Sequence, residues 1–311
     1  MARFLVTGGA GFIGSHIVGA LVNRGDAVRV LDNLSTGSRS NLPASPDQVE
    51  FIEGDVSDLA CVRRAMADVE VVFHEAALAS VSRSVEDPVA THEVCATGTL
   101  NVLVAARDAG VRRVVYAASS SAYGNIPVLP NREDQVPCPL SPYAAAKLAG
   151  EHYCTAFTDV YGLETVRLRY FNIFGPRQDP ASPYSAVIPL FINAMVAGRT
   201  PTIFGDGKQS RDFTYVENVV HANLLAAETP NIAGKMFNVA TGTSVSLLDL
   251  IRLINQNLGS NVVPKHAAPR PGDVKHSRAD IALAKSLMGY EPRVGLEEGL
   301  RRAVAYYRSH G

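Results

Sequence analysis

Short runs of β-branched and apolar residues alternate with stretches of helical spacing along the first half of the chain. Residues 3–7 form the first apolar run, and apolar side chains then recur every three or four positions from Phe12 to Leu21. Further runs of the same kind follow at 27–32, 49–55, 69–77, 111–120 and 163–172. Strands that alternate with helices in this way are typical of a parallel sheet covered on both faces. The pattern therefore predicts an α/β fold built on a doubly wound parallel sheet.

The pattern changes in the second half of the chain. Prolines, glycines and shorter segments replace the regular alternation, although residues 246–258 form an amphipathic stretch with Ser246 and Asp249 placed as a capping box. No repeat, low-complexity tract or long linker separates the two parts. We predict a Rossmann-like first domain over 1–175 and a smaller C-terminal α/β lobe over 176–311, from which strands can return to the first domain. Ligands of doubly wound sheets bind beyond the carboxyl ends of the strands, and those ends would face the lobe.

Composition and charge exclude several classes of partner. The chain has 311 residues, 47% of them hydrophobic, and its 29 basic and 30 acidic residues give a net charge of -1. This balance provides no general attraction to nucleic acid or to an anionic membrane, so a small polar ligand is expected. The first apolar run is too short for a signal sequence or a membrane span. The four cysteines stand far apart with no Cys-x-x-Cys pair, so we predict neither a metal site nor disulfides, and expect a cytoplasmic protein.

Residues 7–14, TGGAGFIG, connect the first strand to the first helix. Gly8, Gly11 and Gly14 have no side chains, so the backbone N–H groups at the helix N-terminus can approach a pyrophosphate. Asp32 ends the second strand, where its carboxylate would accept hydrogen bonds from a ribose 2′-hydroxyl and repel a 2′-phosphate. A plain tight turn is the alternative. The strand, turn, helix and acid together favour a dinucleotide site that prefers NAD to NADP.

Further cofactor contacts are expected from the ends of neighbouring strands. Positions that follow the third and fourth strands would lie near the adenine and the second ribose. The predicted cofactor-binding residues are Gly8, Gly11, Phe12, Ile13, Gly14, Asp32, Asn33, Asp55, Val56, Ala76, Ala77, Tyr143, Lys147 and Tyr170.

A tyrosine and a lysine share one face of a predicted helix that begins in the segment SPYAAAK. Ser141 and Pro142 suit a helix start, and Lys147 stands one helical turn after Tyr143. A tyrosine hydroxyl with a pKa of about 10 is a poor base at neutral pH, and a nearby ammonium would lower that pKa by stabilising the phenolate. The alternative is a buried tyrosine beside a lysine that only packs. The serine-rich strand end that precedes the segment and the dinucleotide turn favour catalysis.

With these motifs the chain resembles the UDP-hexose 4-epimerase family of extended short-chain dehydrogenases/reductases, essentially from end to end. The resemblance implies that Tyr143 takes the proton from the sugar 4-hydroxyl while hydride passes from C4 to NAD, which is regenerated when hydride returns to the opposite face. It also implies that Ser119 binds the 4-oxygen and that Lys147 binds the nicotinamide ribose. Ser120 and Ser121 are secondary candidates. Related dehydratases carry Asp and Glu at these two positions and related decarboxylases a glutamate in this segment, so neither reaction is favoured here.

The resemblance also implies a nucleotide-sugar site in the second half of the chain. The segments RYFNIFGPR, FGDGKQSRDFTYV and APRPGD resemble those that hold the UDP group in the family. Asn172, Arg211 and Arg270 would bind the diphosphate, because a guanidinium offers paired donors at fixed charge, and Asp273 would bind the uridine ribose. Surface salt bridges are the alternative for each arginine. The predicted substrate-binding residues are Ser80, Ser119, Ser120, Ser121, Tyr143, Asn172, Val187, Phe191, Phe204, Arg211, Arg270, Asp273 and Ser277.

Ser277 indicates which sugars are accepted. In the family, the residue four positions after the one that corresponds to Asp273 limits the space beside the sugar C2 substituent, and small residues there accompany acceptance of N-acetyl sugars. We therefore expect turnover of UDP-GlcNAc and UDP-GalNAc as well as UDP-Glc and UDP-Gal. The alternative is that Ser277 is a plain loop residue and that neighbouring side chains close the pocket.

Two positions depart from the family pattern. Cys95 stands where many relatives have asparagine, so a cofactor or structural hydrogen bond is missing or replaced. Glu75 is less apolar than its counterpart in many relatives, which changes the expected surroundings of the nicotinamide. His74 beside it is interpreted as a satisfied strand-end histidine rather than a catalyst.

Two other functions stay open from the sequence. A UDP-uronate or UDP-pentose 4-epimerase would use the same chemistry on a different C5 substituent. An NAD-binding sensor without turnover would share the fold, but such proteins commonly lose the tyrosine or the lysine, and this chain retains both. The resemblance further implies a homodimer, formed through a helix over 100–109 and the helix that begins near Tyr143.

Overall fold

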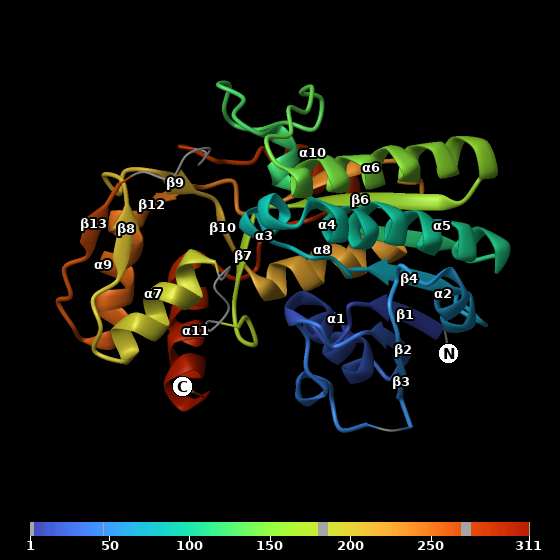
Figure 1. The fold of residues 1–311 in the computed structure, drawn as a ribbon, viewed down its shortest axis with the longest axis horizontal. Helices are drawn as coiled ribbons and strands as arrows, with labels where there is room; N and C mark the ends of the chain where they lie inside the picture. Colours follow the sequence, from blue (N-terminus) through green and yellow to red (C-terminus); the bar gives the residue numbers. More distant parts are fainter. Residues whose placement is uncertain (1–2, 46, 180–185, 269–274, 311) are drawn as a thin grey trace.

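Seven parallel strands form one sheet at the centre of the molecule (Figure 1). The computed structural model describes residues 3–45, 47–179, 186–268 and 275–310. The strand order is β11-β6-β5-β4-β1-β2-β3, which reverses direction at β1 as a doubly wound sheet does. The strands are β1 (Arg3–Thr7), β2 (Ala27–Asp32), β3 (Val49–Glu53), β4 (Val71–His74), β5 (Arg113–Ser119), β6 (Glu164–Tyr170) and β11 (Met236–Val239). The predicted fold class is confirmed.

Helices cover both faces of this sheet, because successive strand residues point to opposite sides. On one face Phe4 and Val6 are buried in a core shared with α1, α8 and α10, whereas Leu5 points into a second core with α2, α5 and α6. Each face is therefore sealed by apolar contacts. The helices are α1 (Phe12–Asn23), α2 (Leu59–Ala65), α5 (Gly98–Asp108), α6 (Pro142–Tyr161), α8 (Val216–Glu228) and α10 (Ala282–Met288).

The link between β4 and α5 is wound differently from a regular helix. Two short helices, α3 (Val81–Glu86) and α4 (Pro88–His92), lead into a π-helical turn, η2 (Glu93–Thr97), which continues directly into α5. Such π-turns are often found at functional sites. This one places the buried side chain of Cys95 against Tyr143 and Ala146 of α6.

A second lobe lies to one side of the sheet (left in Figure 1) and has its own apolar core. Three helices, α7 (Val187–Val196), α9 (Leu247–Leu258) and α11 (Leu296–His310), surround three short strand pairs. Ser246 caps α9 by accepting a hydrogen bond from the Asp249 backbone at 3.1 Å. The pairs join β7 (Asn172–Phe174) to β10 (Phe213–Tyr215), β8 (Thr202–Phe204) to β13 (Lys265–Ala267), and β9 (Ser210–Arg211) to β12 (Val245–Ser246).

The chain crosses between the two parts more than once. Beyond residue 175, the strand β11 pairs with β6 at the edge of the main sheet, and α8 and α10 pack on one of its faces. β6 itself is followed after one residue by β7, which belongs to the lobe. The lobe is thereby fixed beside the carboxyl ends of β5 and β6.

Helix α6 carries the Tyr143 and Lys147 pair, and its position follows from local sequence. Ser141 accepts a hydrogen bond from the Ala144 backbone at 3.2 Å, and Pro142 occupies the first turn, where its missing N–H has no cost. Gly150 lets the helix approach β5, because a Cβ there would lie 2.3 Å from the Tyr116 hydroxyl. None of the helices in the described ranges has the length and apolar character that a membrane crossing requires.

Candidate active site

The glycines of the first turn are required by close backbone contacts. Gly8 has a φ of 67° in the left-handed region, and a Cβ there would lie 2.7 Å from the Ala76 nitrogen. A Cβ on Gly14 would lie 2.2 Å from the Gly8 carbonyl oxygen. Gly11 caps α1 without any side-chain hydrogen bond, and the first turn of α1 contains no acidic residue. The positive end of the helix dipole is thus left available for an anion.

A cavity of about 610 Å³ opens at this helix end, beyond the carboxyl ends of β1, β2, β3 and β4. Asp32 ends β2, and its carboxylate accepts hydrogen bonds from the backbone of Ala10 at 2.9 Å and of Leu34 at 2.8 Å. Hydrogen bonds from Ser57 and Asn33 lower the pKa of Asp55 despite partial burial, which raises it. The predicted residues that line this cavity are Gly8, Gly11, Phe12, Ile13, Gly14, Asp32, Asn33, Asp55, Val56, Ala76, Ala77, Ser80 and Asn172.

These residues fit an NAD molecule on physical grounds. The helix end and the close backbone approach suit a pyrophosphate, and the Asp32 carboxylate suits a ribose diol rather than a 2′-phosphate. An arginine of the second lobe strengthens the case: the Arg177 guanidinium donates to the Ser15 hydroxyl of α1 at 3.3 Å. A cation beside the positive end of a helix is unfavourable unless an anion lies between them.

Tyr143, Lys147 and Ser119 come together at the end of β5. The Lys147 side chain is only 2% exposed, and its ammonium donates to the Ala117 carbonyl oxygen at 2.8 Å. The Ser119 hydroxyl lies near the Tyr143 hydroxyl, where it acts to lower the pKa of the phenol, and it accepts a hydrogen bond from the Ser121 hydroxyl at 2.8 Å. A hydroxyl placed between these two groups would meet both a proton acceptor and a hydrogen-bond donor.

Burial opposes the effect that Lys147 is expected to have on the pKa of Tyr143. Burial raises the pKa of Tyr143 well above 10, and Cys95 and Glu75 add to this, while the hydrogen bond with Ser119 opposes it. Burial also lowers the pKa of Lys147, whose ammonium is directed to the Ala117 carbonyl rather than to the phenol. NAD held in the first cavity would supply a positive nicotinamide charge, and such a charge near Tyr143 would lower the pKa of its hydroxyl.

A second cavity of about 320 Å³ lies in the lobe and shares Asn172 with the first. It brings together all the predicted lobe residues that the structure describes apart from Ser277, namely Asn172, Val187, Phe191, Phe204 and Arg211. Arg211 donates to the backbone oxygens of Ser210 at 3.0 Å and Lys275 at 3.2 Å. Ser277 bonds through its backbone nitrogen to the Ser210 oxygen, one residue from Arg211. Arg270 and Asp273 lie outside the described residues.

Several residues in these cavities were not anticipated from the sequence. Arg177 lines the first cavity in a left-handed conformation, with φ of 65°, which is unfavourable for a residue with a side chain and is typical of functional positions. Gln209 and Phe213 line the second, where Gln209 donates to the Phe204 carbonyl oxygen at 2.6 Å. All three stand inside or next to the segments already recognised, so their proximity to those segments was the available signal.

His74 is held as a neutral structural residue. Its two ring nitrogens contact the hydroxyls of Thr7 at 2.7 Å and Thr99 at 3.0 Å. Burial, together with the Lys147 charge, lowers the pKa of His74 to about 3. It therefore carries no charge at neutral pH, as the sequence interpretation expected. Among the described residues, no group of His, Cys, Asp and Glu is arranged to hold a metal ion.

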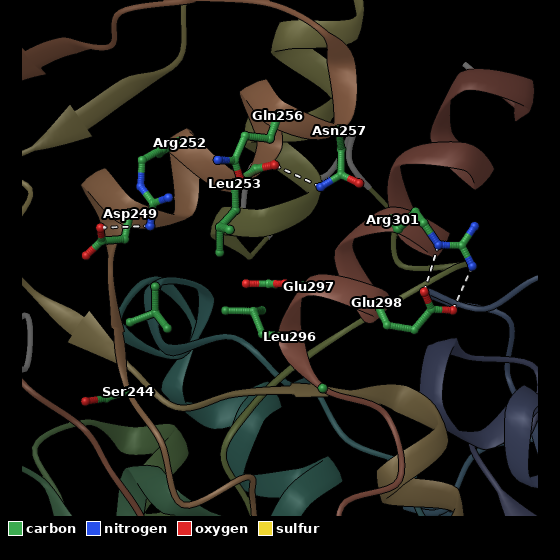
Figure 2. Close-up of a pocket in the computed structure, with 12 residues that line it drawn as sticks. Ser244, Asp249, Arg252, Leu253, Gln256, Asn257, Leu296, Glu297, Glu298 and Arg301 are labelled. Carbon is green, nitrogen blue, oxygen red and sulfur yellow. Dashed lines mark hydrogen bonds and ion pairs between the residues drawn. The ribbon is translucent and has the colours of Figure 1, made fainter.

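A third groove lies elsewhere, between α9 and α11 (Figure 2). Its volume is about 990 Å³, and four of its charged side chains form two ion pairs within the groove. Asp249 pairs with Arg252 at 3.5 Å, and Glu298 with Arg301 at 2.7 Å. The groove contains none of the glycine turn, the Tyr143 cluster or the lobe cavity, so size alone does not locate the site.

The fold and this site define a Rossmann-fold enzyme of the short-chain dehydrogenase/reductase type, with a nucleotide cofactor. The chain belongs to the NAD dependent epimerase/dehydratase family, whose model matches residues 4–240. It is similar to the UDP-glucose 4-epimerase of Mycolicibacterium smegmatis, with 41% identity over 99% of each chain.

Two solved structures of 4-epimerases are also similar to this chain over its full length. A UDP-N-acetylglucosamine 4-epimerase from Methanobrevibacter ruminantium, in complex with UDP-N-acetylmuramic acid, has 42% identity and a TM-score of 0.95 over 100% of this chain and 99% of its own. A UDP-glucose 4-epimerase from Thermus thermophilus, in complex with NAD, has 40% identity and a TM-score of 0.91 over 99% of this chain and 100% of its own. NAD is thus the cofactor of the family to which this chain belongs.

Proposed function

We propose that the protein catalyses the NAD-dependent C4 epimerisation of UDP-hexoses through a transient 4-keto sugar. The observation that carries the proposal is the gathering of Ser119, Tyr143 and Lys147 at the end of β5, within electrostatic reach of Glu75 in the wall of the first cavity. That cavity shares Asn172 with the second. One cavity fits the dinucleotide, and the other has the arginine and aromatic side chains that suit a nucleotide diphosphate sugar. The relatives of about 40% identity that act on UDP-glucose support the choice of hexose.

Each residue of the cluster has a distinct role in this proposal. NAD, when bound, accepts hydride from C4 of the sugar and returns it. Tyr143 removes the proton from the 4-hydroxyl and gives it back, and Ser119 donates a hydrogen bond to the 4-oxygen. Lys147 holds the nicotinamide ribose and keeps positive charge near the phenolate. Ser120 and Ser121 provide further hydroxyls beside Ser119 but neither the acid nor the base that loss of water requires.

The two cavities divide the binding of cofactor and substrate. In the first, the cofactor is assigned to the predicted residues around Gly8, Asp32 and Asp55, with Tyr170 beside them and Arg177 added from the structure. In the second, Asn172 and Arg211 hold the diphosphate, and apolar side chains enclose the base. The lobe residues assigned to the uracil are Val187, Phe191 and Phe204.

The direct test is to incubate the purified protein with UDP-galactose, UDP-GalNAc and UDP-glucuronate and to identify the products by proton NMR. UDP-glucose from UDP-galactose supports the proposal. Conversion of UDP-glucuronate alone would instead indicate a uronate epimerase, a function carried by a relative of 33% identity. No conversion of any sugar would contradict the epimerase assignment and favour a sensor.

We further propose that Ser277 leaves room for an N-acetyl group on C2 of the sugar. Its side chain is half-buried, and its backbone bonds to Ser210, next to Arg211 of the lobe cavity. Ser277→Tyr should reduce kcat/KM for UDP-GalNAc by about 10- to 200-fold while leaving UDP-galactose turnover nearly unchanged. Ser277→Ala, which adds no bulk, is the matched control. Equal UDP-GalNAc turnover by wild type and Ser277→Tyr would rule out this role.

We propose a homodimer formed through α5 and α6, which lie side by side in Figure 1. Exposed apolar side chains on and beside α6 support this choice, including Val89, Tyr153 and Val160. The double variant Val89→Asp/Tyr153→Asp should shift the protein from dimer to monomer in light scattering after size exclusion. Leu287→Asp, at an exposed apolar position on α10, should leave the mass unchanged. A wild-type protein of monomer mass would refute the proposal.

We also place the protein in the cytoplasm. All four cysteines, Cys61, Cys95, Cys138 and Cys154, are free thiols in the structure, and a reducing compartment preserves that state.

A further inference from the structure

Glu75 places a carboxyl group in the wall of the dinucleotide cavity. The residue follows β4 directly, is half-buried, and lines the cavity together with Gly8 and Ala76. Its Oε1 accepts a hydrogen bond from the Tyr170 hydroxyl at 2.7 Å. Within the described ranges this is its one hydrogen-bond partner. The four residues that follow Glu75 also line the cavity and are alanines and a leucine, so an acid here requires an explanation.

The carboxyl group is held in a fixed position by a buried chain of hydrogen bonds. Asn223 of α8, which is fully buried, donates to the Tyr170 oxygen at 2.7 Å and to the Val219 carbonyl at 2.9 Å. The Tyr170 oxygen therefore accepts a hydrogen bond from the Asn223 amide, and its own hydrogen is donated to Glu75. Burial keeps the pKa of Tyr170 well above 10, so this hydroxyl stays a donor at every physiological pH.

Glu75 also lies within electrostatic reach of the reacting groups. From α6, the Lys147 ammonium lowers its pKa, and the charge of Glu75 in turn acts on both Tyr143 and Lys147. Tyr170 of β6 faces Glu75 through its hydroxyl. His74, the residue before Glu75 at the end of β4, is uncharged at neutral pH. Burial outweighs these effects and raises the pKa of Glu75 to about 7. The group is therefore present in both charged and neutral forms near neutral pH.

We propose that Glu75 sets the balance between oxidised and reduced cofactor in this cavity. A carboxylate stabilises the positively charged nicotinamide ring of NAD and gives no such stabilisation to the neutral ring of NADH. Because Glu75 lines the cavity with Gly8 and lies within electrostatic reach of Tyr143 and Lys147, its charge acts at the reacting end of the cavity rather than at the adenine end. The proposal rests on the assignment of this cavity to the cofactor.

The consequence for catalysis concerns the keto intermediate. Hydride transfer to the ring removes its positive charge, so an ionised Glu75 disfavours the reduced state and favours return of hydride to the sugar. The 4-keto sugar then has a shorter life, and its escape from the enzyme is limited. A neutral Glu75 gives the reduced state a longer life, and the balance follows pH.

The sign of the pH effect follows from linkage. NAD stabilises the carboxylate and so lowers the pKa of Glu75 in the complex, which means that NAD binding becomes stronger as pH rises from 6 to 8. NADH has a neutral nicotinamide ring and does not favour the charged form of Glu75, so its binding should not strengthen with pH in this way. For a pKa that falls by about one unit on NAD binding, from about 7 to about 6, the ratio of the NADH to the NAD dissociation constant should rise about fivefold over this range.

The experiment measures both dissociation constants by titration calorimetry on the full chain at pH 6 and pH 8. In Glu75→Gln the ratio should be lower at pH 8 and independent of pH. Tyr170→Phe removes a hydrogen bond that stabilises the carboxylate, so the rise in the ratio should move to higher pH without disappearing. Asp55→Asn removes a carboxylate from another part of the cavity and should weaken both nucleotides equally.

The outcomes separate this proposal from the cofactor assignment. A ratio that does not change with pH in the wild type, or that changes equally in Glu75→Gln, would overturn the role of Glu75 while NAD binding stands. If the ratio of dissociation constants lost its pH dependence in Tyr170→Phe as well as in Glu75→Gln, Glu75 would serve only to position Tyr170, and the proposal would be overturned. Binding of neither nucleotide would overturn the cofactor assignment and this proposal with it.

Discussion

Replacing Tyr143 by phenylalanine should lower kcat for UDP-galactose by about 10²- to 10⁴-fold, the usual contribution of a positioned acid or base. Phenylalanine keeps the ring that packs against Cys95 and Ala146 but has no hydroxyl to exchange a proton with the sugar. The Lys147 ammonium is bonded to the Ala117 carbonyl rather than to Tyr143, so its position does not depend on the phenol. KM should therefore change much less than kcat.

The matched control lies almost three turns further along the same helix. Tyr153 is 39% exposed on α6, and Tyr153→Phe removes the same hydroxyl away from the cavity. That variant should keep wild-type kcat. Bound NAD, measured from the absorbance of the purified protein, should be retained in both variants. A Tyr143→Phe enzyme with more than a tenth of the wild-type kcat would show that another group moves the proton.

Replacing Arg169 by leucine should destabilise the protein by about 3–5 kcal/mol, because it leaves a buried carboxylate without its partner. Arg169 of β6 is 1% exposed and Glu151 of α6 is 2% exposed. They form a two-point pair, with nitrogen to oxygen distances of 2.8 and 2.7 Å, and the guanidinium lies 4.5 Å from the Tyr123 ring. The pair joins α6 to the sheet one turn beyond Lys147. Urea denaturation measures the loss.

A double variant distinguishes the pair from simple packing. Arg169→Leu/Glu151→Leu removes both charges, so most of the stability lost in Arg169→Leu should return. Arg132→Leu breaks an exposed pair with Asp134 and should leave the free energy of unfolding nearly unchanged. If the double variant were less stable than Arg169→Leu, the loss would come from packing of the arginine stem and not from an unpaired charge.

The sheet could be predicted closely because its signal is local. The runs at 3–7 and 27–32 coincide with β1 and β2, and the later runs overlap β3 to β6 with ends shortened by one to three residues. The short strand pairs of the lobe could not be found in this way, since two or three residues have no periodicity. The return of β11 to the main sheet depends on contacts between distant segments, which a linear pattern does not contain.

The candidate site was predictable in its parts but not in its electrostatics. Glycine spacing and the acid after the second strand locate the cofactor cavity, and the spacing of Tyr143 and Lys147 places both on one helical face. Spacing says nothing about burial, so the raised pKa of Tyr143 and the hydrogen bond from Lys147 to the Ala117 carbonyl were not foreseen. Glu75 stood out only as an unusual residue, and its bond to Tyr170 required the fold.

The central claim is that hydride leaves C4 of the sugar and returns to the same carbon. It is tested most directly with UDP-galactose that carries deuterium at C4, incubated with the protein in ordinary water and followed by NMR. We expect UDP-glucose that retains deuterium at C4, because the hydride is held on the cofactor and does not exchange with solvent. UDP-glucose with protium at C4, or no UDP-glucose at all, would contradict it.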